Sequence, residues 1–498
     1  MYISTRNNYQ SVNASQAIKL GMVPNGGLFV PEKIPVIKNL ESLLGKSYEE
    51  VALEVLSLYL DDYSREEIKA CINKAYGDKQ NWRAIAPLYR LTARTYFLEL
   101  WHGPTAAFKD LALQLMPHLL SAALEKTQVS KEVIILVATS GDTGKAALEG
   151  FKNVPGLQIV CFYPYQGVSC LQEKQMITTT GKNVHVVGVK GNFDDCQNAV
   201  KALFGEQEFR SFLAEKGYLL SSANSINWGR LVPQIVYYVF AYLNLVSGGG
   251  IDFGQAINIV VPTGNFGNIL AAWYAAQMGV PVGKLICASN ENKVLTDFFH
   301  SGVYNRQRSL KQTISPSMDI LISSNLERFL FEMTERNGNL LSEWMHDLQV
   351  KGSFSISEPL LEKIRQILWG GYAAETETLA MINNIYLKSG YLLDPHTAVG
   401  MKVYEQYAVE TRDDRATIVV STASPFKFAA SVLRAFPDVK ISGQTDEFAL
   451  LRKLSKKSGW SIHPALLDLH EKPILHARLA SKTEIKQELL NILGTFIP

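Results

Sequence analysis

Three turns, two of them rich in glycine, follow apolar, strand-like runs, and each could bind a phosphate group. They lie at 138–145 (ATSGDTGK), 262–268 (PTGNFGN) and, as a weaker case, 421–427 (STASPFK). Turns at the carboxyl ends of strands are the usual ligand sites of α/β sheets. The free N–H groups of such a turn and the positive end of the following helix suit a phosphate.

The common nucleotide and hydrolase motifs do not fit these turns. A P-loop would place glycine at Thr139 and Ser or Thr at Ala146, so a kinase or ligase with a Walker-type site is not indicated. Ser140 follows Thr139, so the α/β-hydrolase motif GxSxG fails as well. The dinucleotide motif GxGxxG is absent from all three turns.

The second turn is the most informative, because successive backbone amides could curl around a single phosphate. An ordinary strand-to-helix turn, with an asparagine as the helix cap, fits the same sequence. Both interpretations concern the residues Gly264, Asn265, Phe266, Gly267 and Asn268.

Lys109 is the candidate nucleophile. It lies at the edge of the apolar helical face that Phe108 and Leu111 begin, in the segment 102–114. A surface lysine whose stem covers that face is the common alternative. A buried amine would instead favour its neutral form, which alone attacks an aldehyde. A reactive lysine together with a phosphate turn fits pyridoxal phosphate, which carries one aldehyde and one phosphate.

Two further polar groups could complete such a site. Thr422 ends the run 417–421 and could either cap a helix or donate a hydrogen bond to a ring nitrogen of the cofactor. The segment 221–230 (SSANSINWGR) concentrates amides and hydroxyls and ends at Arg230. Its arginine suits a phosphate or carboxylate, although a polar loop that caps the next helix is an equal alternative.

The elements around these turns alternate between strand and helix, which predicts an α/β fold with parallel sheets flanked by helices. Continuous apolar runs indicate buried strands. The expected strands are 133–139, 157–162, 184–189, 257–261, 285–288 and 417–421, and the expected helices are 141–151, 171–179, 194–216 and 269–278.

The length of 498 residues predicts about three domains. Proline and glycine cluster early in residues 1–90, which we expect to form a separate N-terminal domain. A smaller α/β domain is expected over 131–234. A mostly helical insertion is expected over 301–399, where the alternation is lost. The ranges 91–130, 235–300 and 400–498 would form the large domain.

Composition and charge limit the partners. Hydrophobic residues make up 47% of the chain, which excludes a mainly disordered protein. The net charge of +2 is small for a nucleic-acid-binding protein, and no apolar stretch is long enough to span a bilayer. The five cysteines form no CxxC pair and no histidines form HExxH, so we expect reduced thiols, a cytoplasmic location and no metal site. The sequence does not distinguish a monomer from a dimer.

Seven segments together resemble the threonine synthase family, pyridoxal-phosphate enzymes of the tryptophan-synthase-β-like group (fold type II). The resemblance covers nearly the whole chain. Leu111 and Ala112 follow the lysine motif, as in the long bacterial and fungal type, where the shorter type usually reads FKDRG. The segments are 2–6 (YISTR), 26–32 (GGLFVPE), 102–110 (HGPTAAFKD), 138–144 (ATSGDTG), 224–230 (NSINWGR), 262–268 (PTGNFGN) and 421–428 (STASPFKF).

The resemblance implies a fold type II enzyme with an extra N-terminal domain and a helical insertion. It implies that Lys109 carries the cofactor, that residues 264–268 hold its phosphate and that Thr422 meets its pyridine nitrogen. Ser424 stands where the family often has histidine. The implied reaction is that of O-phospho-L-homoserine and water to L-threonine and phosphate, by γ-elimination and β-hydration. We expect Ser140, Asp142, Thr143 and Arg230 to line the substrate site.

Two other functions compete with this interpretation. A related pyridoxal-phosphate lyase, acting on another phosphorylated or hydroxylated amino acid, would share the cofactor motifs. A catalytically silent metabolite-binding protein on the same fold is disfavoured, because Lys109 is intact.

Overall fold

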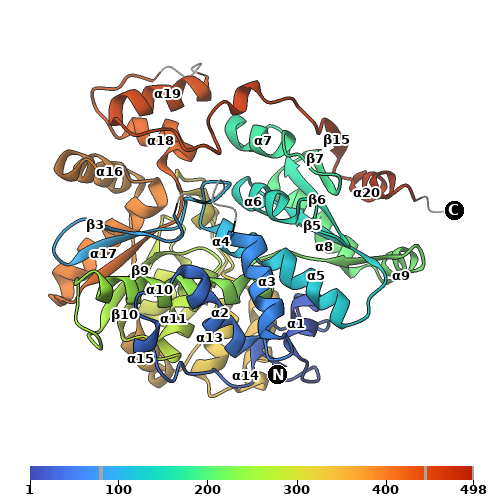
Figure 1. Cartoon of the computed structure of the whole chain (residues 1–498), viewed down its shortest axis with the longest axis horizontal. Helices are drawn as coiled ribbons and strands as arrows, with labels where there is room; N and C mark the ends of the chain where they lie inside the picture. Colours follow the sequence, from blue (N-terminus) through green and yellow to red (C-terminus); the bar gives the residue numbers. More distant parts are fainter. Residues whose placement is uncertain (78–81, 83, 442–445, 496–498) are drawn as a thin grey trace.

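The computed structural model describes residues 1–77, 82, 84–441 and 446–495, and two sheets organise it (Figure 1). The first sheet has six strands, and only its edge strand β3 runs antiparallel. In spatial order they are β13 (Leu368–Tyr372), β10 (Val282–Ser289), β9 (Ile257–Pro262), β14 (Thr417–Ser421), β4 (Thr95–Glu99) and β3 (Leu88–Arg90).

The second sheet has five strands, all parallel. Their order is β15 (Arg478–Ser481), β7 (Val184–Lys190), β6 (Leu157–Pro164), β5 (Glu132–Ala138) and β8 (Tyr218–Ser221). The predicted α/β class with parallel sheets is therefore confirmed.

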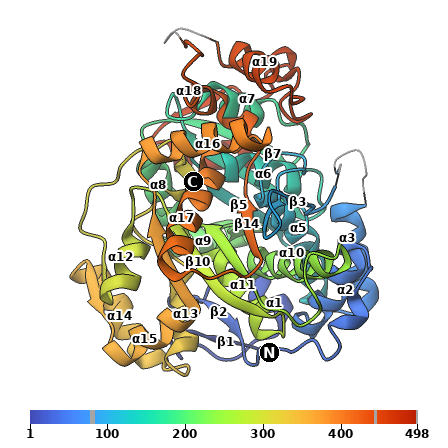
Figure 2. The same ribbon diagram turned by 90° about the vertical axis from the view of Figure 1, so that its left-hand side faces the viewer.

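Both sheets are buried on two faces, which explains the continuous apolar runs of their strands. In β9, Ile259 belongs to the core cluster that contains α10 and α11, whereas its neighbour Val260 belongs to the cluster that contains α16 and α17. Neighbouring residues of a strand point to opposite faces, so these helix pairs cover opposite sides of the first sheet (Figure 2). The four helices are α10 (Trp228–Ser247), α11 (Gly267–Gln277), α16 (Glu375–Ser389) and α17 (Pro395–Thr411).

The second sheet is covered in the same way. One face packs with α6 (Asp142–Phe151) and the other with α8 (Phe193–Gly205) and α20 (Ile485–Leu493). The single helix predicted over 194–216 is wrong. The backbone becomes extended at Glu206, which ends α8 and starts α9 (Gln207–Glu215). Helix α7 (Cys170–Ile177) packs beside α6.

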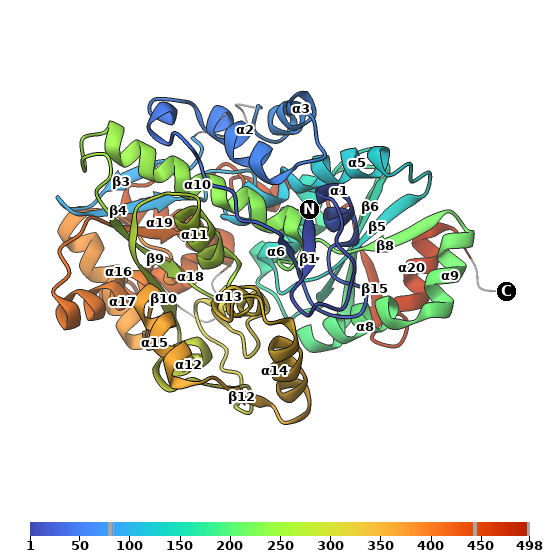
Figure 3. The same ribbon diagram turned by 90° about the horizontal axis from the view of Figure 1, so that it is seen from below.

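Helix α2 (Tyr48–Tyr59) lies against α10, and Figure 3 shows it at the top together with α3 (Arg65–Tyr76). Capping boxes begin α2 at Ser47 and α3 at Ser64, where each serine accepts an N–H bond and a glutamate three residues later returns one. The elements are β1 (Tyr2–Ser4), α1 (Ala14–Leu20), β2 (Phe29–Pro31), α2 (Tyr48–Tyr59) and α3 (Arg65–Tyr76), followed by α4 (Lys109–Leu113) and α5 (Met116–Lys126).

Two strands depart from the predicted domain ranges. β13 lies within 301–399 but extends the first sheet, and β15 lies within 400–498 but extends the second. The chain crosses from α18 (Ala429–Arg434) and α19 (Glu447–Ser458), at the upper left of Figure 1, to β15 and α20 at its right. The rest of the range 301–399 is mostly helical. It follows α12 (Val294–Ser301) and contains β11 (Val303–Asn305), α13 (Leu326–Met333), α14 (Gly338–Val350), β12 (Ser353–Ser355) and α15 (Glu358–Ile367).

Short 3₁₀ turns complete the chain, and two of them reach the candidate site. They are η1 (Glu41–Leu43), η2 (Pro316–Met318), η3 (Pro425–Phe428) and η4 (Leu469–Glu471). Within the described ranges, no helix combines the length and the apolarity that crossing a membrane requires.

Candidate active site

Lys109 is the first residue of α4, and the loop before it is fixed to the end of β14. Phe108 donates its backbone N–H to the carbonyl of Thr422 at 2.8 Å, and Ala107 forms a β-bridge with Ala423. Ala106 takes a left-handed conformation, with φ of 61°, and so turns the chain into this contact. Lys109 and Thr422, which was predicted to meet the cofactor's ring nitrogen, are therefore neighbours in space, although 313 positions separate them in the chain.

The Lys109 side chain is buried, with 9% of the residue exposed. Its Nζ donates to the Ser317 hydroxyl at 3.1 Å and lies 3.8 Å from Asp142 Oδ2. Burial lowers the pKa of this amine to about 8, and the Asp142 carboxylate opposes that shift. A neutral amine is thus available not far above neutral pH, as a nucleophile for an aldehyde requires. The alternative of a solvated surface lysine does not hold.

Asp142 and Lys427 form a buried ion pair that joins the two halves of the site. Lys427 Nζ lies 2.8 Å from Asp142 Oδ1 and donates to the carbonyl of Thr105 at 3.1 Å. Burial alone would raise the pKa of Asp142, but Lys427 and Lys109 hold that pKa well below its usual range. Asp142 starts α6 on the second sheet, whereas Lys427 follows the first sheet in η3. The sequence assigned no role to Lys427.

The glycine-rich turn after β9 leaves its amides free. Within the described residues, the backbone N–H groups of 264–268 meet no protein acceptor. Phe266 takes φ of 61° and is buried, which directs the turn into α11. A Cβ on Gly264 would stand 2.5 Å from the carbonyl oxygen of Ser317, so only glycine fits there. The side chains of Ser323 and Asn325 hold the carbonyls of Gly264 and Asn265 from outside.

Asn268 does not cap the helix, contrary to one of the two interpretations of this turn. The cap position belongs to Phe266, and Asn268 lies inside the first turn of α11. Its Oδ1 accepts hydrogen bonds from Tyr237 at 2.7 Å and from Tyr238 at 2.5 Å. Its Nδ2 is buried with no protein acceptor among the described residues. The turn therefore presents unpaired donors on both backbone and side chain.

Arg230 lies in the first turn of α10 with only 4% of the residue exposed. Nη1 donates to the carbonyl of Ala223 at 2.8 Å, while Nε is buried with no acceptor in the described structure. Burial lowers the pKa of Arg230 to about 10, and its positive charge also lowers the pKa of Lys109. Arg230 is thus a buried cation whose charge acts on the amine, with a donor to spare for an anion.

The other two predicted substrate residues are placed less closely. Ser140 is exposed and Thr143 is half-buried, both on the turn that carries Asp142. In the part of the chain that the structure describes, Lys109 forms its hydrogen bond with Ser317 and its ion pair with Asp142, and neither with Ser140 or Thr143. The structure thus brings together Lys109, Asp142 and Arg230 and leaves Ser140 and Thr143 at the rim of this group.

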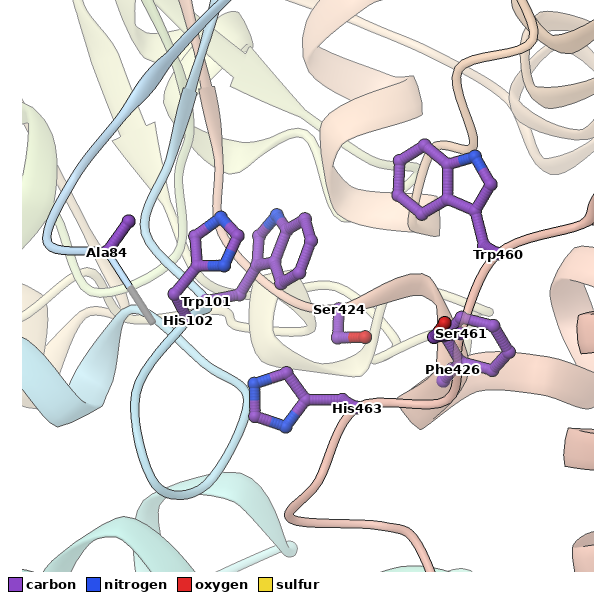
Figure 4. Close-up of a pocket in the computed structure, with 8 residues that line it drawn as sticks. All are labelled: Ala84, Trp101, His102, Ser424, Phe426, Trp460, Ser461 and His463. Carbon is purple, nitrogen blue, oxygen red and sulfur yellow. The ribbon is translucent and has the colours of Figure 1, made fainter. Parts of the chain in front are cut away.

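Thr422 is buried, and its hydroxyl has no hydrogen-bond partner within the described residues. Two residues later, Ser424 lines a separate pocket of about 330 Å³ (Figure 4). The Ser424 hydroxyl is buried and has no described partner. The other lining residues are Ala84, Trp101, His102, Phe426, Trp460, Ser461 and His463. The serine thus leaves open space beside the segment that carries Thr422.

Besides Lys427, three residues of the site were missed in the sequence: Ser317, Asp394 and His396. Ser317 lies in η2 and binds Lys109, while its backbone N–H donates to His396 Nε2 at 3.2 Å. His396 Nδ1 in turn lies 2.8 Å from Asp394 Oδ1. The available signal was Asp-Pro-His-Thr at 394–397, where aspartate caps α17 and proline occupies its first position.

The free groups of the site fit pyridoxal phosphate. Lys109 supplies an amine, the Thr422 hydroxyl lacks a protein partner, and the amides of 264–268 with Asn268 Nδ2 lack acceptors. Buried donors without acceptors are costly unless a ligand satisfies them, and these donors suit an anion. No three metal-ligating side chains gather anywhere in the described ranges.

Three family models match the chain. "Threonine synthase N terminus" matches residues 1–76, "Pyridoxal-phosphate dependent enzyme" matches 82–422, and "Threonine synthase, C-terminal" matches 397–458. The second alone covers more than half of the chain.

Relatives are similar over most of the chain. It is 43% identical to threonine synthase-like 1 of Homo sapiens over 94% of its own length, but spans only 65% of that protein. It is 36% identical to the threonine synthase of Schizosaccharomyces pombe, covering 89% of this chain and 91% of that one. The Pseudomonas aeruginosa threonine synthase is 38% identical, covering 87% and 90%.

Solved structures agree with these relatives. A threonine synthase from Brucella melitensis with bound pyridoxal phosphate superposes with a TM-score of 0.87 at 36% identity, covering 99% of both chains. The yeast threonine synthase gives a TM-score of 0.88 at 31% identity, covering 99% of this chain and 98% of that one.

Proposed function

The chain belongs to the threonine synthase family of pyridoxal-phosphate-dependent enzymes, and on that premise we propose that it converts O-phospho-L-homoserine and water into L-threonine and phosphate. The observation that carries the proposal is the buried Lys109 amine. It lies beside two further buried cations, Arg230 and Lys427, in a site whose nearest carboxylate is Asp142.

The residues that would hold the cofactor follow from the free groups of the site. Lys109 would bind the aldehyde, the amides of 264–268 would bind the phosphate, and the Thr422 hydroxyl would donate to the ring nitrogen. A hydroxyl at that position suits a neutral nitrogen, whereas a carboxylate would hold the nitrogen protonated. When bound, pyridoxal phosphate supplies an electron sink for negative charge that develops on the substrate carbons.

The Lys109 amine is the proton carrier of this proposal. Once the substrate amine had replaced it on the aldehyde, Nζ would be a free amine, and its lowered pKa would let it accept a proton from the substrate Cα and later return one. Ser317 holds Nζ at 3.1 Å, so the amine is already oriented before a substrate arrives. The same amine reaches a range of positions through its flexible stem, which suits proton transfer at more than one carbon.

The buried cations would bind the acidic groups of the substrate. Arg230 has an unpaired Nε for a phosphate or carboxylate oxygen, and Lys427 neutralises Asp142, which would otherwise repel such groups. Phosphate leaves from Cγ in the overall reaction, and water adds at Cβ. Ser140 and Thr143, at the rim, would add hydroxyl contacts to the substrate.

We also propose a location for the site within the chain. It lies between a large cofactor-binding domain (91–130, 235–300 and most of 400–498) and the smaller domain 131–234, with 1–90 and 301–399 as additions. β13 joins the large domain and β15 the smaller one in this division. Four of the five cysteines are buried as free thiols, which supports a reducing, cytoplasmic setting.

The test measures phosphate and threonine released from O-phospho-L-homoserine by the enzyme with added pyridoxal phosphate. Equal amounts of the two products are expected, and none of either from Lys109→Ala. Phosphate without threonine would contradict the proposal and favour the alternative, a related lyase that acts on another phosphorylated or hydroxylated amino acid. Neither product, despite bound cofactor, would refute the substrate assignment.

A further inference from the structure

Ser317 contacts both of the groups that the proposed cofactor would bridge. Its hydroxyl accepts a hydrogen bond from Lys109 Nζ at 3.1 Å. Its carbonyl oxygen covers the Cα of Gly264, so closely that a Cβ there would come within 2.5 Å of it. Ser317 therefore lies between the amine and the glycine-rich turn, and a shift of this one residue would move both.

The segment around Ser317 is held on one side by a polar cluster. Asp319 accepts hydrogen bonds from the Thr313 hydroxyl at 2.8 Å and from the side-chain amides of Asn290 at 2.7 Å and Asn292 at 2.9 Å. Asn290 also donates to Ser315, next but one before Ser317. This cluster fixes the path of 313–319 but does not touch the Ser317 peptide itself.

His396 binds the segment around Ser317 from the other side. Its Nε2 accepts the Ser317 N–H at 3.2 Å, and its Nδ1 lies 2.8 Å from Asp394 Oδ1. An acceptor Nε2 requires the tautomer whose proton is on Nδ1, and the Asp394 carboxylate stabilises that tautomer. Both side chains are buried, with 2% of His396 and 1% of Asp394 exposed. Capping α17 needs only Asp394, so it leaves the burial of an imidazole against Ser317 unexplained.

We propose that Ser317 orients the Lys109 amine for proton transfer at the substrate, and that His396, set in its tautomer by Asp394, is a positioning residue that acts through the Ser317 peptide. This inference rests on the proposed function, since it concerns the same lysine. The order of contacts is Asp394 to His396, His396 to the Ser317 backbone, and the Ser317 hydroxyl to Lys109.

Other charged groups face the amine as well, so the test must isolate the Ser317 hydroxyl from them. They come from four different elements and stay constant in the variants used. They are Asp110 on α4, Asp142 on α6, Arg230 on α10 and Lys427 in η3.

The first experiment follows the attachment of pyridoxal phosphate to the cofactor-free enzyme as a function of pH, through the visible absorbance of the lysine-bound cofactor. No substrate is involved. The midpoint reports the pH at which Lys109 becomes neutral. Because a hydroxyl that accepts from the charged amine stabilises it, Ser317→Ala should lower that midpoint by about one unit. His396→Leu should lower it in the same direction, and His396→Gln, whose amide oxygen can still accept the Ser317 N–H, should retain most of the wild-type value.

The double variant Ser317→Ala/His396→Leu decides whether His396 acts through Ser317. The proposal predicts that the double variant has the same attachment midpoint as Ser317→Ala, because without the Ser317 hydroxyl His396 can no longer affect Lys109. Shifts that add would overturn the role of His396, and an unchanged midpoint in Ser317→Ala would overturn that of Ser317. His185→Gln, on β7, is the matched control that should behave as wild type.

Turnover supplies a second readout. In Ser317→Ala and His396→Leu, kcat should fall about tenfold or more while KM changes little, because the amine is misplaced and the substrate contacts are not. Circular dichroism and thermal melting check that each variant folds, and His396→Gln covers the case in which leucine is not tolerated. A wild-type enzyme that never attaches the cofactor would refute the proposed function itself. If the wild type attaches the cofactor but the variants have wild-type midpoints, only the roles of Ser317 and His396 would be refuted.

Discussion

Gly264→Ala is a one-methyl change that should disable the cofactor turn. The added Cβ would stand 2.5 Å from the Ser317 carbonyl oxygen and 3.6 Å from the Cα of Met318. Both are backbone atoms of η2, so no side chain can rotate out of the way. Either the turn 264–268 or the segment that carries Ser317 must move.

The size of the effect follows from the cost of over-packing a close contact. Inserting a methyl group into such a contact typically costs about 1 to 3 kcal/mol. If the turn yields and the cost appears in cofactor binding, the Kd for pyridoxal phosphate should rise roughly 5- to 150-fold. If η2 yields instead, Ser317 leaves Lys109, and the midpoint pH of cofactor attachment should fall as it does in Ser317→Ala.

The assay is an equilibrium titration of the cofactor-free enzyme with pyridoxal phosphate, beside a thermal melt. Gly205→Ala is the matched control, because a Cβ at this exposed end of α8 meets no atom within 4 Å. It should bind the cofactor like the wild type. If Gly264→Ala also bound and melted like the wild type, the close approach of Ser317 to the turn would be refuted.

Three further predictions concern the charges of the site and of α6. Asp142→Asn should lower the free energy of unfolding in urea by about 3 to 5 kcal/mol, because it leaves the Lys427 ammonium buried without its carboxylate. Adding Lys427→Met should recover part of that loss, and a single variant as stable as the wild type would contradict the pairing. Arg230→Ala should raise KM about tenfold or more in steady-state kinetics, whereas an unchanged KM would remove Arg230 from the substrate site. Burial alone would raise the pKa of Glu149, but Lys145 and Lys152 lower that pKa to about 2. Because the folded pKa is depressed, the stabilisation is present above the unfolded value and is lost as the pH falls through the folded one. Between the folded and the unfolded pKa of Glu149, the free energy of unfolding should therefore depend less on pH in Glu149→Gln than in the wild type. An unaltered pH dependence would count against the pairing.

The strands that positioned the site were predictable where both faces are buried. β9 and β14 are continuous apolar runs, and the structure gives them nearly the predicted bounds. β13 (LWGGY) and β15 (RLAS) carry glycine or exposed polar residues, so their pairing depends on neighbours that only the tertiary structure supplies. The helix break at Glu206 has no proline, and the preceding Gly205 is a weak signal.

The residues of the site likewise divide into those that the sequence revealed and those that only the structure revealed. Motif residues such as Lys109 and Thr422 were found because they lie in recognisable segments. Ser317 and His396 were not, because their roles arise from contacts across 208 and 79 positions of the chain, and serine and histidine in a helical region carry no signal of their own. The pairing of Lys427 with Asp142, which joins the two sheets, likewise exists only in three dimensions.

The central claim is that Lys109 carries pyridoxal phosphate, and one measurement addresses it directly. The enzyme with bound cofactor is reduced with borohydride, digested and analysed by mass spectrometry. The account predicts that the reduced pyridoxyl-phosphate mass is found on the peptide that contains Lys109, and that it is absent from Lys109→Ala. The same mass on Lys427, or on any lysine other than Lys109, would contradict the account.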